Sequence, residues 1–174
     1  MIVSLAFLRT LVKTDLSDEV LAVKLDAIES MIRKYTNNNF QDRNFRDRMN
    51  CAEDNLLIGC PPSLNPEDTI EISNSQFNNG LYVVKDVLET GIEVDKPLIE
   101  EEGVLVTKIT YPSDVKMGVV NLIDWELNNR SKVGIKSESL SRYSVTYYDM
   151  DSNSEVGFPA SMIGFLKPYK RARF

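Results

Sequence analysis

The pattern of hydrophobic and polar positions changes its period twice along the chain. After Ser17, apolar side chains recur at steps of three and four, which predicts an amphipathic helix with one buried stripe. Ser17 is placed to cap the start of this helix, and the polar run 36–39 predicts its end. A shorter amphipathic helix is expected over residues 4–13. The stripe of the longer helix consists of Leu21, Leu25, Ile28, Ile32 and Tyr35.

From about residue 50 the hydrophobic period shortens toward that of a strand, after prolines interrupt the chain. Apolar and β-branched residues predict strands at 69–72, 81–84, 91–94 and 104–111. These strands would make a small antiparallel sheet or barrel, which is only marginally stable alone. We therefore expect it to pack on the helices.

The helical period resumes after Pro112, with Ser113 or Asp114 as the capping residue. Pro159 fits the first turn of a last short helix, which Pro168 would end. The predicted fold class is therefore α+β: a helical domain of about four helices with an inserted small antiparallel β-sheet or barrel.

The predicted domain boundaries follow from these changes of period. Residues 1–49 and 112–174 would form one discontinuous helical domain, and residues 50–111 an inserted β-rich subdomain. Residues 133–150 are rich in Ser, Gly and Tyr and end in an alternating stretch, which predicts an extended arm.

Composition then narrows the function classes. The chain has 43% hydrophobic and 26% charged residues, which is typical of a globular protein, and its apolar runs are too short to span a bilayer. The start of the chain lacks a basic signal-peptide region, and Arg9 and Lys13 interrupt its apolar stretch. The chain contains no histidine, so the commonest general base and metal ligand are missing. We expect a protein without enzymatic activity, cofactor or membrane partner.

The candidate metal and redox residues have simpler interpretations. Cys51 and Cys60 fit no zinc or redox spacing and are expected to be free thiols. The stretch 149–155 begins like a calcium loop, but Ser154 stands where the loop needs glycine and Ala160 where it needs glutamate. An acidic turn is favoured there, and solvent-facing charge is favoured for residues 100–102.

Basic residues gather in two segments, although the formal net charge of −6 disfavours general DNA binding. Segment 32–48 mixes arginines with aromatic rings, as nucleic-acid grooves do, but Asp42 and Asp47 neutralise part of it. Local ion pairing or an intersubunit contact is therefore favoured over DNA. The C-terminal cations lie beside Tyr169 and Phe174, and this composition fits a docking peptide and a solvated chain end equally well.

Segment 27–40, AIESMIRKYTNNNF, resembles a signature of the head-tail connector, or adaptor, proteins of siphoviruses that infect Gram-positive bacteria. Residues 137–147, 157–160 and 164–169 resemble the end of the same family. The resemblance covers about residues 15–48 and 113–174 and departs from the family in the β-rich middle.

The resemblance implies a helical adaptor subunit that forms a ring, usually of twelve copies, under the portal of a phage head. Such a ring extends the DNA channel and provides the docking platform for the next neck or tail protein. Its implied partners are the portal protein, neighbouring copies of itself and a downstream head-tail stopper or tail protein, with DNA only as a passing occupant. Its place is the virion neck, after assembly in the bacterial host cytoplasm.

Two groups of residues fit this implied role by their own composition and pattern. The portal-docking residues are Lys167, Pro168, Tyr169, Lys170, Arg171, Arg173 and Phe174. The residues of the intersubunit arm are Leu140, Arg142, Tyr143, Val145 and Tyr147. The alternative hypothesis is a small phage nucleic-acid-binding or regulatory protein that uses the segment from Arg33 to Arg48.

Overall fold

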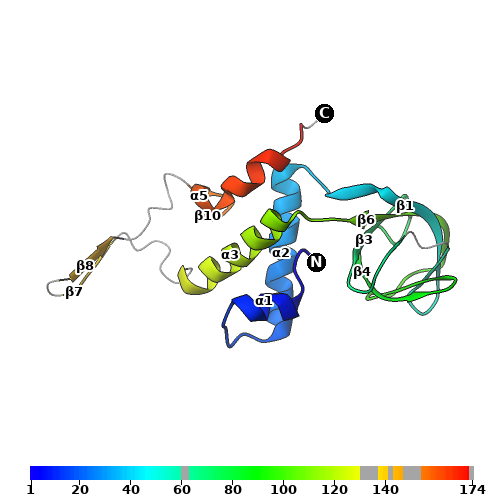
Figure 1. Cartoon of the computed structure of the whole chain (residues 1–174), viewed down its shortest axis with the longest axis horizontal. Helices are drawn as coiled ribbons and strands as arrows, with labels where there is room; N and C mark the ends of the chain where they lie inside the picture. Colours follow the sequence, from blue (N-terminus) through cyan, green and yellow to red (C-terminus); the bar gives the residue numbers. More distant parts are fainter. Residues whose placement is uncertain (60–62, 130–136, 141–142, 147–153, 173–174) are drawn as a thin grey trace. The chain divides into compact units, whose positions relative to one another are not determined.

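The computed structural model describes residues 1–59, 63–129, 137–140, 143–146 and 154–172. The chain divides into two compact units, one built mainly of helices and one built of strands (Figure 1). The strand unit comprises Asn39–Tyr111 with Met1, and the helical unit comprises Ile2–Asn38 with Pro112–Phe174. Among the described residues, each helix is too short or too polar to cross a membrane.

The helical unit is built around α2 and α3. Both helices bury one apolar face: the stripe from Leu21 to Ile32 on α2 is at most 4% exposed, and Val115, Leu122 and Ile123 on α3 are fully buried. The helix predicted after Ser17 is thereby confirmed. The described helices are α1 (Leu5–Leu11), α2 (Asp18–Thr36), α3 (Ser113–Asn129), α5 (Ala160–Ile163) and the 3₁₀ helix η2 (Gly164–Tyr169).

The two ends of α2 have the chemistry that helix ends need. Asp18 and Glu19 lie in the first turn, where negative charge is favoured by the helix dipole. Asn37 caps the other end in the left-handed conformation, with a φ of 50°, and its N–H donates to the carbonyl of Arg33. Asparagine tolerates this conformation better than most residues, which explains the end predicted from the polar run.

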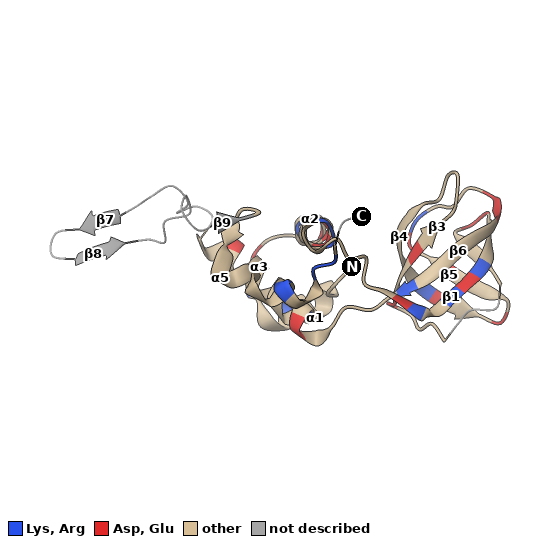
Figure 2. Ribbon diagram, turned by 90° about the horizontal axis from the view of Figure 1, so that it is seen from above, with Lys and Arg blue, Asp and Glu red and all other residues tan. Residues whose placement is uncertain are grey.

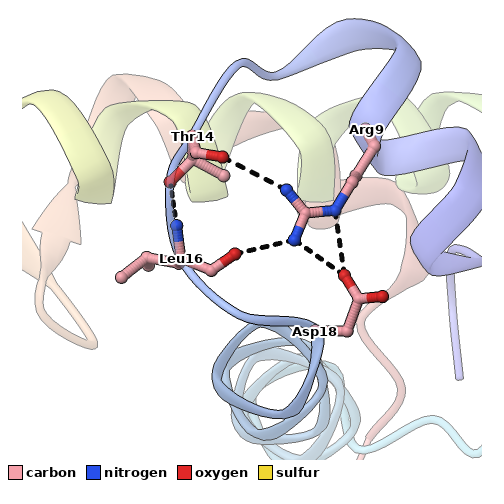
Figure 3. Close-up of polar contacts among 4 residues, drawn as sticks. All are labelled: Arg9, Thr14, Leu16 and Asp18. Carbon is pink, nitrogen blue, oxygen red and sulfur yellow. Dashed lines mark hydrogen bonds and ion pairs between the residues drawn. The ribbon is translucent and has the colours of Figure 1, made fainter.

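The guanidinium of Arg9 stabilises the connection between α1 and α2 (Figure 3). Its Nη1 donates to the carbonyl of Thr14 at 3.1 Å, and its Nη2 donates to the carbonyl of Leu16 at 2.7 Å. Nε and Nη2 both donate to Oδ1 of Asp18, at 2.9 and 2.7 Å. One side chain therefore satisfies two loop carbonyls and also pairs with the start of α2.

The strand unit is a closed antiparallel barrel with the strand order β1-β2-β5-β4-β3-β6. Closure leaves no unpaired edge strand in this sheet. Its interior is filled by fully buried apolar side chains such as Leu57, Ile70, Ile92 and Val104. The strands are β1 (Gln41–Ala52), β2 (Leu56–Ile58), β3 (Thr69–Ser73), β4 (Gly80–Leu88), β5 (Gly91–Val94) and β6 (Glu101–Ile109).

The predicted fold class, a helical domain with a small inserted sheet, is wrong. Within the described residues the structure has four α-helices and a closed barrel of six strands, and about 31% of the chain is strand, so the protein is mainly β. The error begins at β1, whose 12 residues the sequence analysis left largely in the helical domain. Only Met49 and Cys51 are buried in β1, because its charged residues lie on the barrel surface (Figure 2). A strand with so few buried positions lacks the apolar alternation that predicts strands.

Two short strand pairs follow α3 along the chain. β7 (Ser137–Leu140) pairs antiparallel with β8 (Tyr143–Thr146), within the segment predicted as an extended arm. β9 (Ser154–Glu155) pairs with β10 (Phe158–Pro159) directly before α5.

Candidate functional site

The C-terminal segment is held against the end of α2 by main-chain hydrogen bonds. The N–H of Arg171 donates to the carbonyl of Thr36 at 2.8 Å, which satisfies one of the free carbonyls at the helix end. The amide of Asn37 donates to the carbonyl of Ala172 at 2.9 Å, and the amide of Asn38 donates to the carbonyl of Tyr169 at 3.2 Å. The asparagines that end α2 therefore also bind the C-terminal segment.

Side chains add a second set of contacts to the same segment. The hydroxyl of Tyr169 lies 2.8 Å from both carboxylate oxygens of Asp114, at the start of α3. This hydrogen bond is the main reason that the pKa of Tyr169 is raised. The ammonium of Lys170 lies 3.8 Å from the ring centroid of Tyr35, a cation–π contact.

The 3₁₀ helix η2 is also anchored by apolar packing. Leu166 is fully buried, and the ring of Phe165 packs against α3 at Gly118. A Cβ atom at Gly118 would lie only 2.3 Å from Cζ of that ring, so glycine is needed for this close approach. Residues 164–172 are thus part of the helical unit.

Most of the predicted portal-docking residues belong to the segment that these contacts hold against α2. Lys167, Lys170 and Arg171 are exposed, and Lys34 is exposed in the last turn of α2, next to Tyr35. We call these four residues, Lys34, Lys167, Lys170 and Arg171, the basic end. Pro168 is exposed and Tyr169 is half-buried, whereas Arg173 and Phe174 lie outside the described residues.

A groove runs along the exposed side of α2 beside the basic end. Its wider part has a volume of about 410 Å³, and its narrower part has about 190 Å³. Both parts are lined by Ala27, Met31 and Val156, so the floor is apolar and continuous. Lys34 lines the wider part. Lys24 lines the narrower part, where its ammonium lies 2.7 Å from the carboxylate of Glu126.

One end of the barrel carries a loop that is organised around the carboxylate of Glu101. The hydroxyl of Ser75 and the N–H of Gln76 donate to it, the latter at 2.7 Å, and the amide of Asn78 donates at 3.1 Å. These bonds stabilise the charged form, and the hydrogen bond from Ser75 is the largest cause of the lowered pKa of Glu101.

Asn78 connects this loop to the segment before β6. Its amide nitrogen donates to the carbonyl of Ile99 at 2.8 Å, and its amide oxygen accepts from the N–H of Ile99, also at 2.8 Å. Asn78 itself is only 2% exposed, yet Phe77 beside it is 62% exposed and Ile99 is 56% exposed. Buried polar contacts thus hold two apolar side chains in solvent.

Acidic residues lie at the same end of the barrel as these apolar side chains. Cys51 pairs with Glu101 in the sheet, so the turn between β1 and β2, with exposed Glu53 and Asp54, lies at the same end of the barrel. Glu100 and Glu102 are also exposed there. We call Phe77 and Ile99 with Glu53, Asp54, Glu100 and Glu102 the acidic barrel end. The nearby cations Arg48 and Lys96 donate to barrel carbonyls, those of Gly103 and Leu81.

The arginine-rich segment of the nucleic-acid hypothesis does not form one element. Arg33 and Lys34 lie in α2, whereas Arg43, Arg46 and Arg48 lie in β1 of the other unit. Arg46 donates to Oγ1 of Thr107 at 3.0 Å and to Oε1 of Gln41 at 2.9 Å, so its guanidinium is hydrogen-bonded to other residues of the barrel strands.

The other predicted site residues are only partly described. The residues Leu140, Tyr143 and Val145 lie in β7 and β8, whose side chains are not described, and Arg142 and Tyr147 lie outside the described residues. Cys51 is buried and free, and burial raises its pKa to about 11; Cys60 is outside the described residues. The described part of the chain contains no group of His, Cys, Asp and Glu residues that could hold a metal ion.

Sequence reasoning missed the groove and the acidic barrel end. Asn78-Asn79-Gly80 is a local pattern typical of a turn, but the contact between Asn78 and Ile99 joins residues 21 positions apart, which no local pattern reveals. A comparison of the sequence with protein-family models and with curated proteins finds no match.

Proposed function

We propose that the chain is a structural subunit of a bacteriophage neck, a head-tail connector that forms a ring under the portal. The ring would extend the DNA channel and provide the docking platform for a stopper or tail protein. The proposal starts from the resemblance of segments 27–40 and 164–169 to such connectors.

The observation that carries the proposal is the preorganised basic end. The resemblance assigns portal docking to the C-terminal residues, and Lys167, Lys170 and Arg171 are exposed on a segment whose main chain is fixed. A docking surface that is already ordered loses less conformational entropy on binding than a flexible peptide. Exposed cations at such a surface steer association with an acidic partner surface.

The charge of the chain supports the role of DNA as a passing occupant. With a formal net charge of −6, the protein as a whole repels phosphate groups. A channel subunit needs this property, because tight binding would stop the DNA. A ring of many copies also sums individually weak contacts into a stable assembly.

Binding to the portal protein encoded by the same genome tests the proposal. Lys167→Glu combined with Arg171→Glu should weaken portal binding about tenfold or more, because both side chains are exposed and would repel an acidic portal surface. The matched control is Lys13→Glu combined with Lys85→Glu, which reverses two exposed lysines that lie outside the helices in contact with the C-terminal segment. Equal loss in both pairs would contradict a docking role of the basic end.

Two further measurements separate the connector from the nucleic-acid hypothesis. Cryo-electron microscopy of purified virion necks should show this chain as a layer directly against the portal. Tight, salt-dependent binding of free DNA by the isolated protein, without binding to the portal, would instead support a nucleic-acid-binding protein.

A further inference from the structure

We propose that the acidic barrel end of one copy docks into the groove on α2 of a second copy. The inference rests on the proposed role as an assembling subunit, and it names the contact between neighbouring copies. Figure 2 shows the elements that carry both surfaces, the barrel strands and α2.

The two surfaces match in apolar character. Phe77 and Ile99 project from the barrel with 62% and 56% of their surface exposed, and large exposed apolar side chains are the usual anchors of protein interfaces. The wider part of the groove has a volume of about 410 Å³ and an apolar floor of Ala27, Met31 and Val156. Pockets for small ligands begin at roughly 300 Å³, so the groove has room for a protruding aromatic side chain.

The two surfaces also have opposite charge. Exposed Glu53, Asp54, Glu100 and Glu102 lie at the same end of the barrel as the apolar pair. Lys34 lines the wider part of the groove, and Tyr35 in its wall carries the ammonium of Lys170 at 3.8 Å. In the narrower part, Lys24 and Glu126 lie 2.7 Å apart and neutralise each other, so the positive charge at the groove comes from Lys34 and Lys170.

Ordered main chain on both sides favours docking without large rearrangement. Asn78 holds the main chain of Ile99 through hydrogen bonds of 2.8 Å at both its nitrogen and its oxygen. One wall of the groove is α2, a regular helix of 19 residues. A segment whose main chain is already ordered loses less conformational entropy on binding than a flexible one.

The occupant is a second copy because the chain carries both surfaces: the acidic barrel end, and a groove that complements it in charge and apolar character. Such a contact is heterologous, since each molecule uses one surface as donor and a different surface as acceptor. Heterologous contacts continue from copy to copy, so one donor surface and one acceptor surface per chain are enough to build a ring.

Two complementary variants test the contact with the full-length protein alone. Phe77→Asp removes the apolar anchor, and Ala27→Glu fills the groove with a repelling carboxylate on a residue that favours helix. In sedimentation velocity, each variant alone should self-associate more weakly than the wild type, by about tenfold or more. In an equimolar mixture, Phe77→Asp still supplies an intact groove and Ala27→Glu still supplies an intact acidic barrel end. The mixture should therefore form 1:1 dimers that do not add further copies.

Matched controls separate the contact from general effects of charge. Phe7→Asp changes an exposed phenylalanine of α1, and Val23→Glu adds a carboxylate to α2 outside the groove lining. Both controls should assemble like the wild type. If Phe77→Asp or Ala27→Glu fails to fold by circular dichroism, Ile99→Asp and Met31→Glu replace them at the same surfaces.

The inference is overturned if the wild type stays monomeric at high concentration and low salt. It is also overturned if both variants assemble like the wild type, or if their mixture contains only monomers. Portal binding is measured separately. If the protein binds the portal but the mixed variants form no dimers, this contact is ruled out and the proposed function still stands.

Discussion

Substituting Gly118 by alanine should destabilise the helical unit, although alanine is the better helix former. The new methyl group would lie 2.3–2.6 Å from Cζ, Cε2 and Cε1 of Phe165. Carbon atoms in contact normally lie about 3.5–4.0 Å apart, so the ring must move by more than an ångström. Phe165 belongs to η2, and its displacement would disturb the segment that carries the basic end.

The expected magnitude follows from two opposing terms. Replacing glycine by alanine in a helix interior stabilises by about 0.8–1.0 kcal/mol. Overpacking destabilises by about 1–3 kcal/mol, and because Phe165 is half-buried its ring relieves part of the clash by moving outward. We therefore expect Gly118→Ala to lower the free energy of unfolding by about 1 kcal/mol. In a Phe165→Ala background the clash is absent, and the same substitution should stabilise by about 0.8–1.0 kcal/mol.

Urea unfolding followed by tryptophan fluorescence measures this change of sign. The single tryptophan, Trp125, lies in α3 with its ring centroid 5.6 Å from that of Phe158, so it reports on the helical unit. Gly164→Ala is the matched control, because no atom lies within 4 Å of the added Cβ. If Gly118→Ala changed the unfolding free energy equally with and without the Phe165 ring, the proposed steric coupling would be refuted.

Two predictions concern the pH dependence of the barrel. The pKa of Glu101 is lowered chiefly by the Ser75 hydrogen bond, so its stabilising effect is complete above the ordinary value of 4.5 and is lost as the pH falls through the lowered pKa. Glu101→Gln should therefore flatten the acid side of a plot of melting temperature against pH from about 7 to 3, and an unchanged slope would disprove this role. Burial raises the pKa of Cys51 from 9.0 to about 11, so barrel stability should fall as the pH rises from about 9 through 11. In a Cys60→Ser background the thiol should resist a disulfide reagent at about pH 8 until urea unfolds the protein; rapid labelling of the folded protein would contradict its burial.

Elements whose hydrophobic pattern and end signals lie within their own residues could be predicted from the sequence. Elements that are defined by contacts with other segments could not. The helix α2 has its stripe and both of its ends within the 19 residues of the helix itself, so pattern and capping agree. Strand β1 has no such agreement, because its neighbours β2 and β6 supply the contacts that define it. Its charged residues lie on the surface of the barrel, and in the sequence they form one continuous segment with Arg33 and Lys34, which suggested nucleic-acid binding as an alternative hypothesis.

The candidate site shows the same division. Composition identified the C-terminal cations, because lysine and arginine next to aromatic residues can be recognised in a sequence. Their anchoring could not be predicted, because Asp114 and Tyr169 are 55 positions apart and Thr36 is still farther from Arg171 in the chain. Such pairs are defined by tertiary packing of α2, α3 and η2, and neither partner is unusual in its local sequence.

Asparagine side chains hold the main chain at both candidate docking surfaces. Asn37 and Asn38 bind the main chain of the C-terminal segment, and Asn78 binds the main chain of Ile99. A primary amide donates and accepts with only two side-chain torsions, so it can hold a second segment at a small loss of conformational entropy. The surfaces held in this way are opposite in charge, one basic and one acidic. In the contact between copies, salt should screen the acidic residues of the barrel end from the lysine at the groove on α2 and so weaken the contact, while the apolar contribution of Phe77 persists. A residual association at high salt that Phe77→Asp abolishes would separate these two contributions.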